Sequence, residues 1–248
     1  MNDNKFTQRF VIPCYDTDSQ FRLRPSSFMD FAQEIANCHA TVLGFGYDDL
    51  MRTRTAWVLS RMHIHFDEYP KWRDEVVLKT WHKGKDGLFW LRDFEMKDPG
   101  GNPLVRATTS WLVLNIDTRH ISRDTAILDE GTACCENAIG RACEKLSAPK
   151  DAGWTELGTH KVTYSDVDMN SHTNNAKYLQ WVTDALGYEV MTGGTLRDIK
   201  INFNGETRPG ETVTLSRADT PGGTICVDAL TGDGRSAFRM ELLFDKEK

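Results

Sequence analysis

Two stretches of the chain carry apolar residues at the three- and four-residue spacing of an amphipathic helix. The first covers Phe28 to Leu43, and the second begins at Asn175 and includes Tyr178, Leu179 and Val182. The residues that we assign to the ends are Ser26 or Ser27 and Gly44 for the first helix, and Asn174 and Gly187 for the second. The pattern therefore predicts one long helix in each half of the chain.

Strict alternation of apolar and polar residues predicts a half-buried β-strand after each helix. Residues 57–67 alternate in this way in the first half, and residues 198–204 do so in the second. Further strands are predicted at Glu75–Trp81, Leu88–Met96, Val105–Asn115, Thr212–Ala218, Thr224–Thr231 and Ser236–Phe244. Turn-forming runs separate them, among them Gly-Lys-Asp-Gly at 84–87 and Asp-Pro-Gly-Gly-Asn-Pro at 98–103. A helix followed by a meander of antiparallel strands, present twice, is an α+β plan.

The chain aligns with itself at a shift of 150 residues. The matched pairs are Asp16 with Asp166, Asp18 with Asp168, Gln20 with Asn170, Arg22 with His172, Phe28 with Tyr178, and Phe31 with Trp181. We predict an N-terminal domain at 1–120, a linker at 121–155 and a C-terminal domain at 156–248. Residues 118–160 join the copies and carry Ala, Glu and Cys in mildly helical order.

The charge and the apolar content restrict the partners of this 248-residue chain. A formal net charge of -6 without a long basic run argues against general nucleic-acid binding. No apolar run approaches the roughly 20 residues of a membrane span, and the start lacks the apolar stretch of a secretory signal. We therefore expect a cytoplasmic protein without membrane insertion. Candidates for a local basic docking patch are Arg52, Arg54, Lys71, Arg73, Lys83 and Lys85, although scattered Lys and Arg more often form a solvated surface.

Two features could indicate metal or redox chemistry. The six cysteines show neither a Cys-x-x-Cys pair nor a repeated spacing, so we expect reduced packing residues and no zinc site. His63, His65 and Asp67 share one face of a predicted strand, as the ligands of some metal sites do. A polar stripe facing solvent beside a buried apolar stripe is the favoured interpretation, and we predict neither metal nor cofactor.

The polar run ahead of the second helix is the strongest candidate for chemistry. If this segment is extended, Asp168, Asn170 and His172 project to the same side of the backbone. The first-turn amides of the following helix, around Asn174 and Asn175, are natural donors to a developing oxyanion. Asp, Asn and Ser runs also mark ordinary turns and caps, so spacing alone leaves a helix-capping loop as the alternative. The first copy forms the same pattern without Asn or His, which favours a functional role.

Several motifs in order resemble the acyl-acyl carrier protein (ACP) thioesterases of plants and bacteria, which are double hot-dog proteins. They are Trp57-Val-Leu-Ser-Arg-Met, Asp67-Glu-Tyr-Pro-Lys-Trp, Ala107-Thr-Thr-Ser-Trp-Leu-Val-Leu-Asn and the run Ser165 to Tyr178. The resemblance implies a catalytic set of Asp168, Asn170, His172 and Glu206. The position after that Glu is often Cys in plant members; here it is Thr207, which excludes a thiolate. The resemblance also implies a tandem hot-dog fold whose first half binds the acyl tail along Phe28 to Leu43 and neighbouring strands.

The function that this resemblance implies is hydrolysis of fatty acyl-ACP to free fatty acid and ACP, ending fatty acid synthesis. The expected partner is acyl carrier protein, and the chain would be a monomeric double hot dog or a homodimer. The alternatives are an acyl-CoA thioesterase, a non-catalytic acyl-binding hot-dog protein and a hot-dog dehydratase. A CoA substrate needs a nucleotide site, and no Gly-rich phosphate loop is evident. A pure binder has no need of the polar set.

Overall fold

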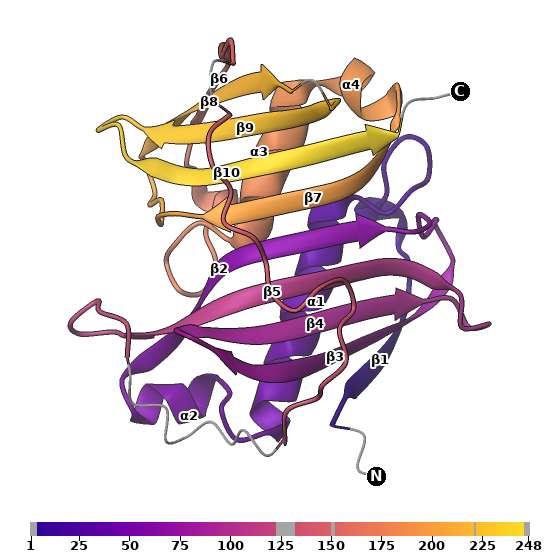
Figure 1. The fold of residues 1–248 in the computed structure, drawn as a ribbon, viewed down its shortest axis with the longest axis vertical. Coiled ribbons are helices and arrows are strands. Elements are labelled where there is room, and N and C mark those ends of the chain that lie inside the picture. The colour runs from indigo at the N-terminus through magenta and orange to yellow at the C-terminus, as the bar shows by residue number, and fades with distance from the viewer. Residues whose placement is uncertain (1–3, 123–131, 150–151, 221, 246–248) are drawn as a thin grey trace. The chain divides into compact units, whose positions relative to one another are not determined.

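The structure, a computed structural model, describes residues 4–122, 132–149, 152–220 and 222–245. The chain divides into two compact units, residues 1–143 and 144–248. Each unit has one long helix and one antiparallel sheet (Figure 1), which confirms the predicted α+β plan. Among the helices of the described residues, none is long and apolar enough to cross a bilayer.

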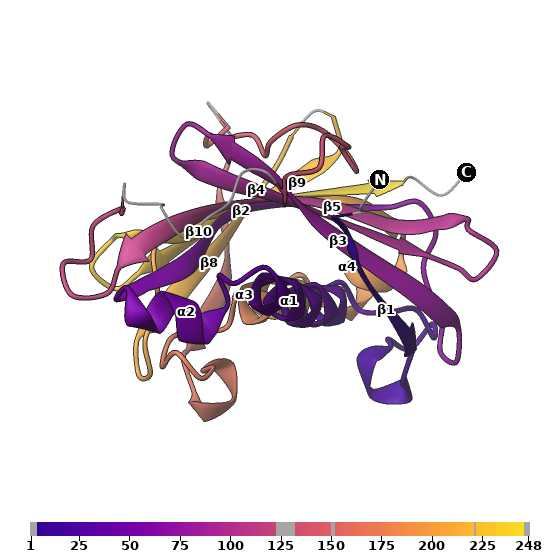
Figure 2. The same ribbon diagram turned by 90° about the horizontal axis from the view of Figure 1, so that it is seen from below.

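The N-terminal unit wraps an antiparallel sheet around its long helix. Its elements are β1 (Phe6–Val11), η1 (Cys14–Asp16), α1 (Pro25–Val42), α2 (Tyr47–Arg52), β2 (Thr55–Phe66), β3 (Glu75–Asp86), β4 (Phe89–Lys97) and β5 (Pro103–Asn115). The strand order is β1-β3-β4-β5-β2. Figure 2, which looks along α1, shows this helix on the concave side of these strands. Phe28, Ala32, Ile35 and Ala36 are the apolar face that α1 buries, as the helical spacing predicts.

The C-terminal unit repeats the arrangement. Its elements are β6 (Thr155–Lys161), η3 (Tyr164–Asp166), α3 (Asn175–Leu186), α4 (Tyr188–Thr192), β7 (Thr195–Phe203), β8 (Thr212–Asp219), β9 (Thr224–Thr231) and β10 (Ser236–Asp245). The strand order is β7-β10-β9-β8-β6. Tyr178 of α3 packs against Phe203 and Phe238, with ring centroids 6.0 and 5.0 Å away. These aromatic contacts fix the first turns of α3 against the sheet.

Three sequence predictions need correction, and two strands were not predicted. The turn predicted at 84–87 lies at 87–88, between β3 and β4. A bulge after His82 places Gly84, at φ +79°, inside β3. Ser26 and Ser27 lie inside α1; Arg24 is the N-cap, and Pro25 at the first position needs no acceptor for an N–H. In the stretch 118–160, for which the sequence gives a mildly helical order, residues 133–149 contain no helix and β6 begins at Thr155; residues 123–131 and 150–151 lie outside the described residues. The strands β1 and β6 were not predicted, because both have partly exposed faces and weak alternation.

The core of the N-terminal unit contains a buried arginine, Arg92, in contact with a neutral histidine, His39. The Arg92 guanidinium Nη1 lies 2.9 Å from His39 Nδ1 and donates to Thr80 Oγ1 at 3.1 Å. Burial lowers the pKa of Arg92 to about 10. Burial, followed by the charge of Arg92, lowers the pKa of His39 to about 3, so His39 is the neutral acceptor. This contact joins α1 to β4 inside the unit.

Candidate active site

The polar run ahead of α3 forms a tight turn and not the extended segment that we predicted. Val167 bridges to Thr173, and the Asp168 amide donates to the His172 carbonyl at 3.0 Å. The Ser171 amide donates to the Asp168 carbonyl at 3.0 Å, and Ser171 has a φ of +62°. Asp168 Oδ1 accepts the Asn170 amide at 2.8 Å, the local bond by which Asp initiates turns. The expected alternation of side chains is therefore lost.

The turn brings His172 beside Glu206, a residue of the loop after β7. His172 Nε2 lies 3.1 Å from Glu206 Oε2. Their side chains are 26% and 30% exposed, so water reaches both groups. Arg235 Nη1 donates to the Glu206 carbonyl at 3.1 Å and holds the loop from the side of β10. A contact between an imidazole and a carboxylate at a partly exposed site has the composition of an acid–base pair.

Asp168 and Asn170 shape the turn that carries His172. The Asp168 carboxylate binds the Asn170 amide, and Asn170 is exposed. The hydrogen bonds that the structure gives these two residues lie within the turn itself. Of the four predicted catalytic residues, His172 and Glu206 are therefore the two whose side chains meet.

Some amides at the N-terminus of α3 already donate hydrogen bonds within the fold, and one in the described part of the chain does not. The Asn174 amide donates to the Asp166 carbonyl at 2.8 Å, and the Ala176 amide donates to Asn174 Oδ1 at 2.9 Å. Asn174 is therefore the N-cap, as predicted. Within the described residues, the Asn175 amide has no acceptor. The expected oxyanion donors are thus narrowed to Asn175, where the helix dipole also favours negative charge.

Sequence reasoning missed the groups that anchor this turn. Asp166 is buried and accepts hydrogen bonds from His160 Nε2 and Trp181 Nε1, both at 3.0 Å, and from the Thr163 hydroxyl at 2.8 Å. Burial alone raises the pKa of Asp166, but the hydrogen bonds from His160, Thr163 and Trp181 outweigh it and lower the pKa to about 2. The 150-residue alignment could have indicated this cluster, because Phe31 takes the place of Trp181 in the first copy.

A second missed group is a set of buried hydroxyls next to the pair. Thr207 Oγ1 lies 2.6 Å from Thr173 Oγ1 and 3.1 Å from the Tyr178 hydroxyl oxygen. Thr173 directly follows His172, and Thr207 directly follows Glu206. No spacing rule connects these positions, since the loop and the turn meet only in the folded unit.

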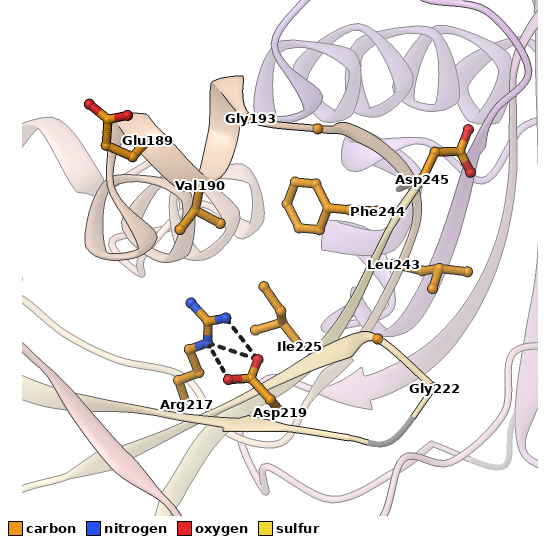
Figure 3. A pocket seen from close by; sticks show the side chains of 12 residues that line it. Glu189, Val190, Gly193, Arg217, Asp219, Gly222, Ile225, Leu243, Phe244 and Asp245 are labelled. Carbon is orange, nitrogen blue, oxygen red and sulfur yellow. Dashed lines mark hydrogen bonds and ion pairs between the residues drawn. The ribbon is translucent and has the colours of Figure 1, made fainter. Parts of the chain in front are cut away.

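A cavity of about 530 Å³ in the C-terminal unit lies away from these residues (Figure 3). Val190 of α4 and Ile225 and Phe244 of β9 and β10 line it, together with Arg217 and Asp219. Arg217 Nη2 is paired with Asp219 Oδ1 at 2.8 Å. Neither His172 nor Glu206 lines this cavity, so it is separate from the candidate site.

Four of the other charged candidates, Arg52, Arg54, Lys83 and Asp67, have charged partners within the N-terminal unit. Lys83 was wrongly included in a basic surface patch: its side chain is 4% exposed, and its ammonium lies 2.8 Å from the buried Asp93 carboxylate. Asp67, the carboxylate that could have joined His63 and His65 as a metal ligand, is paired with Arg106 Nη2 at 2.6 Å. Arg52 is paired with Asp49, and Arg54 with Asp117.

Models of one protein family match nearly the whole chain. The acyl-ACP thioesterase N-terminal domain matches residues 3–133, and the C-terminal domain of the same family matches residues 151–246. The chain is 29% identical over 251 residues to oleoyl-acyl carrier protein thioesterase 2, chloroplastic, of Arabidopsis thaliana, covering 93% of this chain and 67% of that protein. It is 27% identical to the oleoyl-acyl carrier protein thioesterase, chloroplastic, of Coriandrum sativum, covering 98% and 70%.

Solved structures share the fold. An acyl-ACP thioesterase from Bacteroides thetaiotaomicron superposes with a TM-score of 0.90 at 22% identity, covering 98% of both chains. The 12:0-ACP thioesterase from Umbellularia californica superposes with a TM-score of 0.83 at 20% identity, covering 100% of this chain and 99% of that one. The double hot-dog fold and the class of enzyme, a thiolester hydrolase, are confirmed. The chain belongs to the acyl-ACP thioesterase family.

Proposed function

We propose that the chain hydrolyses fatty acyl-ACP to free fatty acid and ACP through the His172–Glu206 pair. The observation that carries this proposal is the 3.1 Å contact between His172 Nε2 and Glu206 Oε2 beside the N-terminus of α3. A thioester carbonyl is electrophilic, and its hydrolysis needs an activated nucleophile and a stabilised oxyanion. The pair supplies the first, and the Asn175 amide supplies the second.

The pair can move one proton from water to the departing sulfur. The Glu206 carboxylate takes a proton from water, and the resulting hydroxide oxygen bonds to the thioester carbon. The negative charge that forms on the carbonyl oxygen faces the Asn175 amide and the positive end of α3. As the C–S bond breaks, the proton on Glu206 passes to His172 Nε2, and Nδ1 gives its own proton to the thiolate. Water is the only co-reactant. Glu206 is again a carboxylate, and His172 is left neutral with its proton on Nε2; proton exchange with the water that reaches this partly exposed side chain restores the Nδ1–H form.

A direct attack of Glu206 on the carbonyl is the second route open to the same pair. The carboxylate oxygen would bond to the acyl carbon, expel the thiolate and leave an anhydride that water then cleaves. Hydroxylamine added during turnover separates the routes, because it captures an anhydride as the acyl hydroxamate. Hydroxamate formed in excess of that in a Glu206→Ala reaction, in which hydroxylamine attacks only the thioester itself, supports direct attack. Release of fatty acid alone supports the general-base route.

The remaining predicted residues have supporting roles in this proposal. Asp168 and Asn170 hold the turn in which His172 sits, since the Asp168 carboxylate binds the Asn170 amide. The acyl tail is assigned to the N-terminal unit, along Phe28 to Leu43 and the neighbouring strands; the residues that α1 buries in this stretch run from Phe28 to Ala40. ACP is the proposed carrier, as the names of the plant relatives state for those proteins.

The test is the release of free fatty acid from a chain-length series of acyl-ACPs and the matching acyl-CoAs. We expect turnover of acyl-ACP by the wild type and losses of about 100-fold to 10,000-fold in Glu206→Ala and His172→Ala. Glu211→Ala is the matched control, because Glu211 lies in the same loop and its carboxylate accepts the Arg208 amide at 3.0 Å. Wild-type rates in folded Glu206→Ala and His172→Ala proteins would overturn the assignment. If acyl-CoA is hydrolysed faster than acyl-ACP, the proposed carrier is CoA and not ACP.

A further inference from the structure

Three buried hydroxyls join the turn of His172 to the loop of Glu206. The Thr207 amide donates to the Tyr178 hydroxyl oxygen at 3.1 Å, and the Thr173 amide donates to the Thr207 carbonyl at 3.1 Å. The Thr207 hydroxyl contacts the hydroxyls of both Thr173 and Tyr178, at 2.6 and 3.1 Å. Thr207 is fully buried, and Thr173 and Tyr178 are only 6% and 2% exposed. The turn and the loop are thus connected by both main-chain and side-chain bonds.

One assignment of hydrogens satisfies every donor in this cluster. The Tyr178 oxygen accepts the Thr207 amide, so its O–H donates to Thr207 Oγ1. The Thr207 hydroxyl then donates to Thr173 Oγ1, and the Thr173 hydroxyl donates to the Thr207 carbonyl at 3.2 Å. Burial raises the pKa of the Tyr178 phenol, which keeps it protonated for this role. A buried network in which every member is satisfied is rigid, because any displacement leaves a group unpaired.

The first unit shows what the same positions contain when no acid–base pair is present. At the 150-residue shift, Thr173 corresponds to Leu23 and Tyr178 corresponds to Phe28. The Leu23 amide donates to the Pro70 carbonyl at 2.8 Å, so Pro70 takes the place of Thr207. Leu23 and Phe28 are fully buried. The fold therefore forms this junction without hydroxyls, and their presence in the second unit calls for another explanation.

We propose that Tyr178, Thr207 and Thr173 are positioning residues that hold His172 and Glu206 at reacting distance. The proposal rests on the role of that pair set out above. Each member of the pair is anchored by the residue that follows it, so the cluster fixes the two Cα positions relative to each other. Proton transfer within the pair needs a heavy-atom separation near 3 Å, and a misplacement of 1 Å can cost about 100-fold in rate.

The decisive variants remove single hydroxyls. Tyr178→Phe deletes one oxygen and keeps the ring packing, and Thr207→Val replaces a hydroxyl by a methyl group. We expect kcat for acyl-ACP hydrolysis to fall about tenfold to 100-fold in both, with KM changed by less than about twofold, because substrate binding is untouched. Thr207→Ser keeps the hydroxyl, and we expect it to retain at least about half of the wild-type kcat.

A matched control separates positioning from loss of stability. Thr109→Val removes a buried hydroxyl of the N-terminal unit, one that donates to the Arg92 carbonyl at 2.8 Å. We expect a lowered melting temperature with unchanged kcat per folded molecule. If Thr207→Val does not fold, Tyr178→Phe decides.

Two results would overturn the positioning role. One is wild-type kcat in folded Tyr178→Phe and Thr207→Val proteins, and the other is an equal loss in Thr207→Ser and Thr207→Val. Both are read against Glu206→Ala: if that variant stays active, the function of the pair itself fails, whatever the hydroxyl variants do.

Discussion

The turn before α1 and the turn before α3 are built from the same backbone hydrogen bonds. In the first, the Asp18 amide donates to the Arg22 carbonyl at 2.8 Å and the Phe21 amide to the Asp18 carbonyl at 3.0 Å. The second has the same two bonds between Asp168, His172 and Ser171, each 3.0 Å long. Phe21 has a φ of +63° in the first copy, and Ser171 has a φ of +62° in the second. The backbone of the candidate site is therefore a feature of the repeat.

The side chains of the two turns differ in what they contact. Arg22 is paired with Asp18, Nε to Oδ2 at 2.9 Å, and its guanidinium lies over the Tyr69 ring at 5.2 Å. In the second copy His172 contacts Glu206 instead. Glu206 precedes Thr207, which accepts the Thr173 amide, as Tyr69 precedes Pro70, which accepts the Leu23 amide in the first copy. Arg22 binds the aspartate of its own turn. In the second copy the Asp168 carboxylate accepts the Asn170 amide, and the His172 side chain contacts Glu206 in the loop after β7. One scaffold thus carries a cation–π contact in one copy and, in the other, the His172–Glu206 contact that we propose transfers protons.

Exchanging the two residues tests this comparison with the largest expected effect. His172→Arg should lower acyl-ACP hydrolysis at least 100-fold, because a guanidinium stays protonated and does not accept a proton from Glu206. The turn already accommodates Arg in the first copy, so we expect a melting temperature within a few degrees of the wild type. Arg22→His is the control and should retain activity within about twofold. Activity in His172→Arg, measured with the same acyl-ACP series, would contradict the role of the imidazole.

The long elements were predictable because each buries one face over many residues. The spacing of Phe28 to Leu43 and the alternation in residues 57–67 repeat often enough to identify α1 and β2. The strands β1 and β6 gave no such signal, because they are short and partly exposed. Their place in the sheet follows from pairing with β3 and β8, which are distant in sequence.

The candidate site was predictable in composition and not in geometry. The turn at Asp168 was read as extended because its polar residues alternate, but the Asp carboxylate closes the backbone onto the Asn170 amide. Glu206 was identified only through the family resemblance, since nothing in a Gly-Glu-Thr-Arg-Pro loop points to His172. Thr173 and Thr207 meet across 34 residues of sequence, and such pairs follow from tertiary packing alone.

Asp16 and Asp166, which lie two residues before Asp18 and Asp168, should differ in their contribution to stability. Asp166 accepts hydrogen bonds from His160 and Trp181, whereas Asp16 has Phe10 and Phe31 at those positions, whose tilted rings pack with centroids 4.9 Å apart. We expect Asp166→Asn to lower the free energy of unfolding by about 2 kcal/mol at pH 7, measured by urea denaturation. Asp16→Asn is the control, with a change below about 0.5 kcal/mol.

The pH dependence of this difference has a definite sign. The pKa of Asp166 is lowered from 3.8 to about 2 in the folded chain, so folding stabilises the ionised carboxylate relative to the protonated acid. Its contribution is complete above a pH of about 4 and disappears as the pH falls to about 2. The stability gap between the wild type and Asp166→Asn should therefore close over that range. A gap that stays constant down to the lowest pH at which the chain folds would assign the effect to packing.

The positive φ that both turns share gives the smallest effect. A non-glycine residue in this conformation costs about 1 kcal/mol or more, partly offset in a glycine variant by the greater freedom of the unfolded chain. Ser171→Gly should therefore raise the free energy of unfolding by about 0.5 kcal/mol. Phe21 stacks on Trp72 with centroids 6.2 Å apart, so Phe21→Gly loses that contact and should gain nothing. Thermal unfolding of both variants measures this; equal gains would show that the two turns are strained alike and that the stacking of Phe21 contributes nothing.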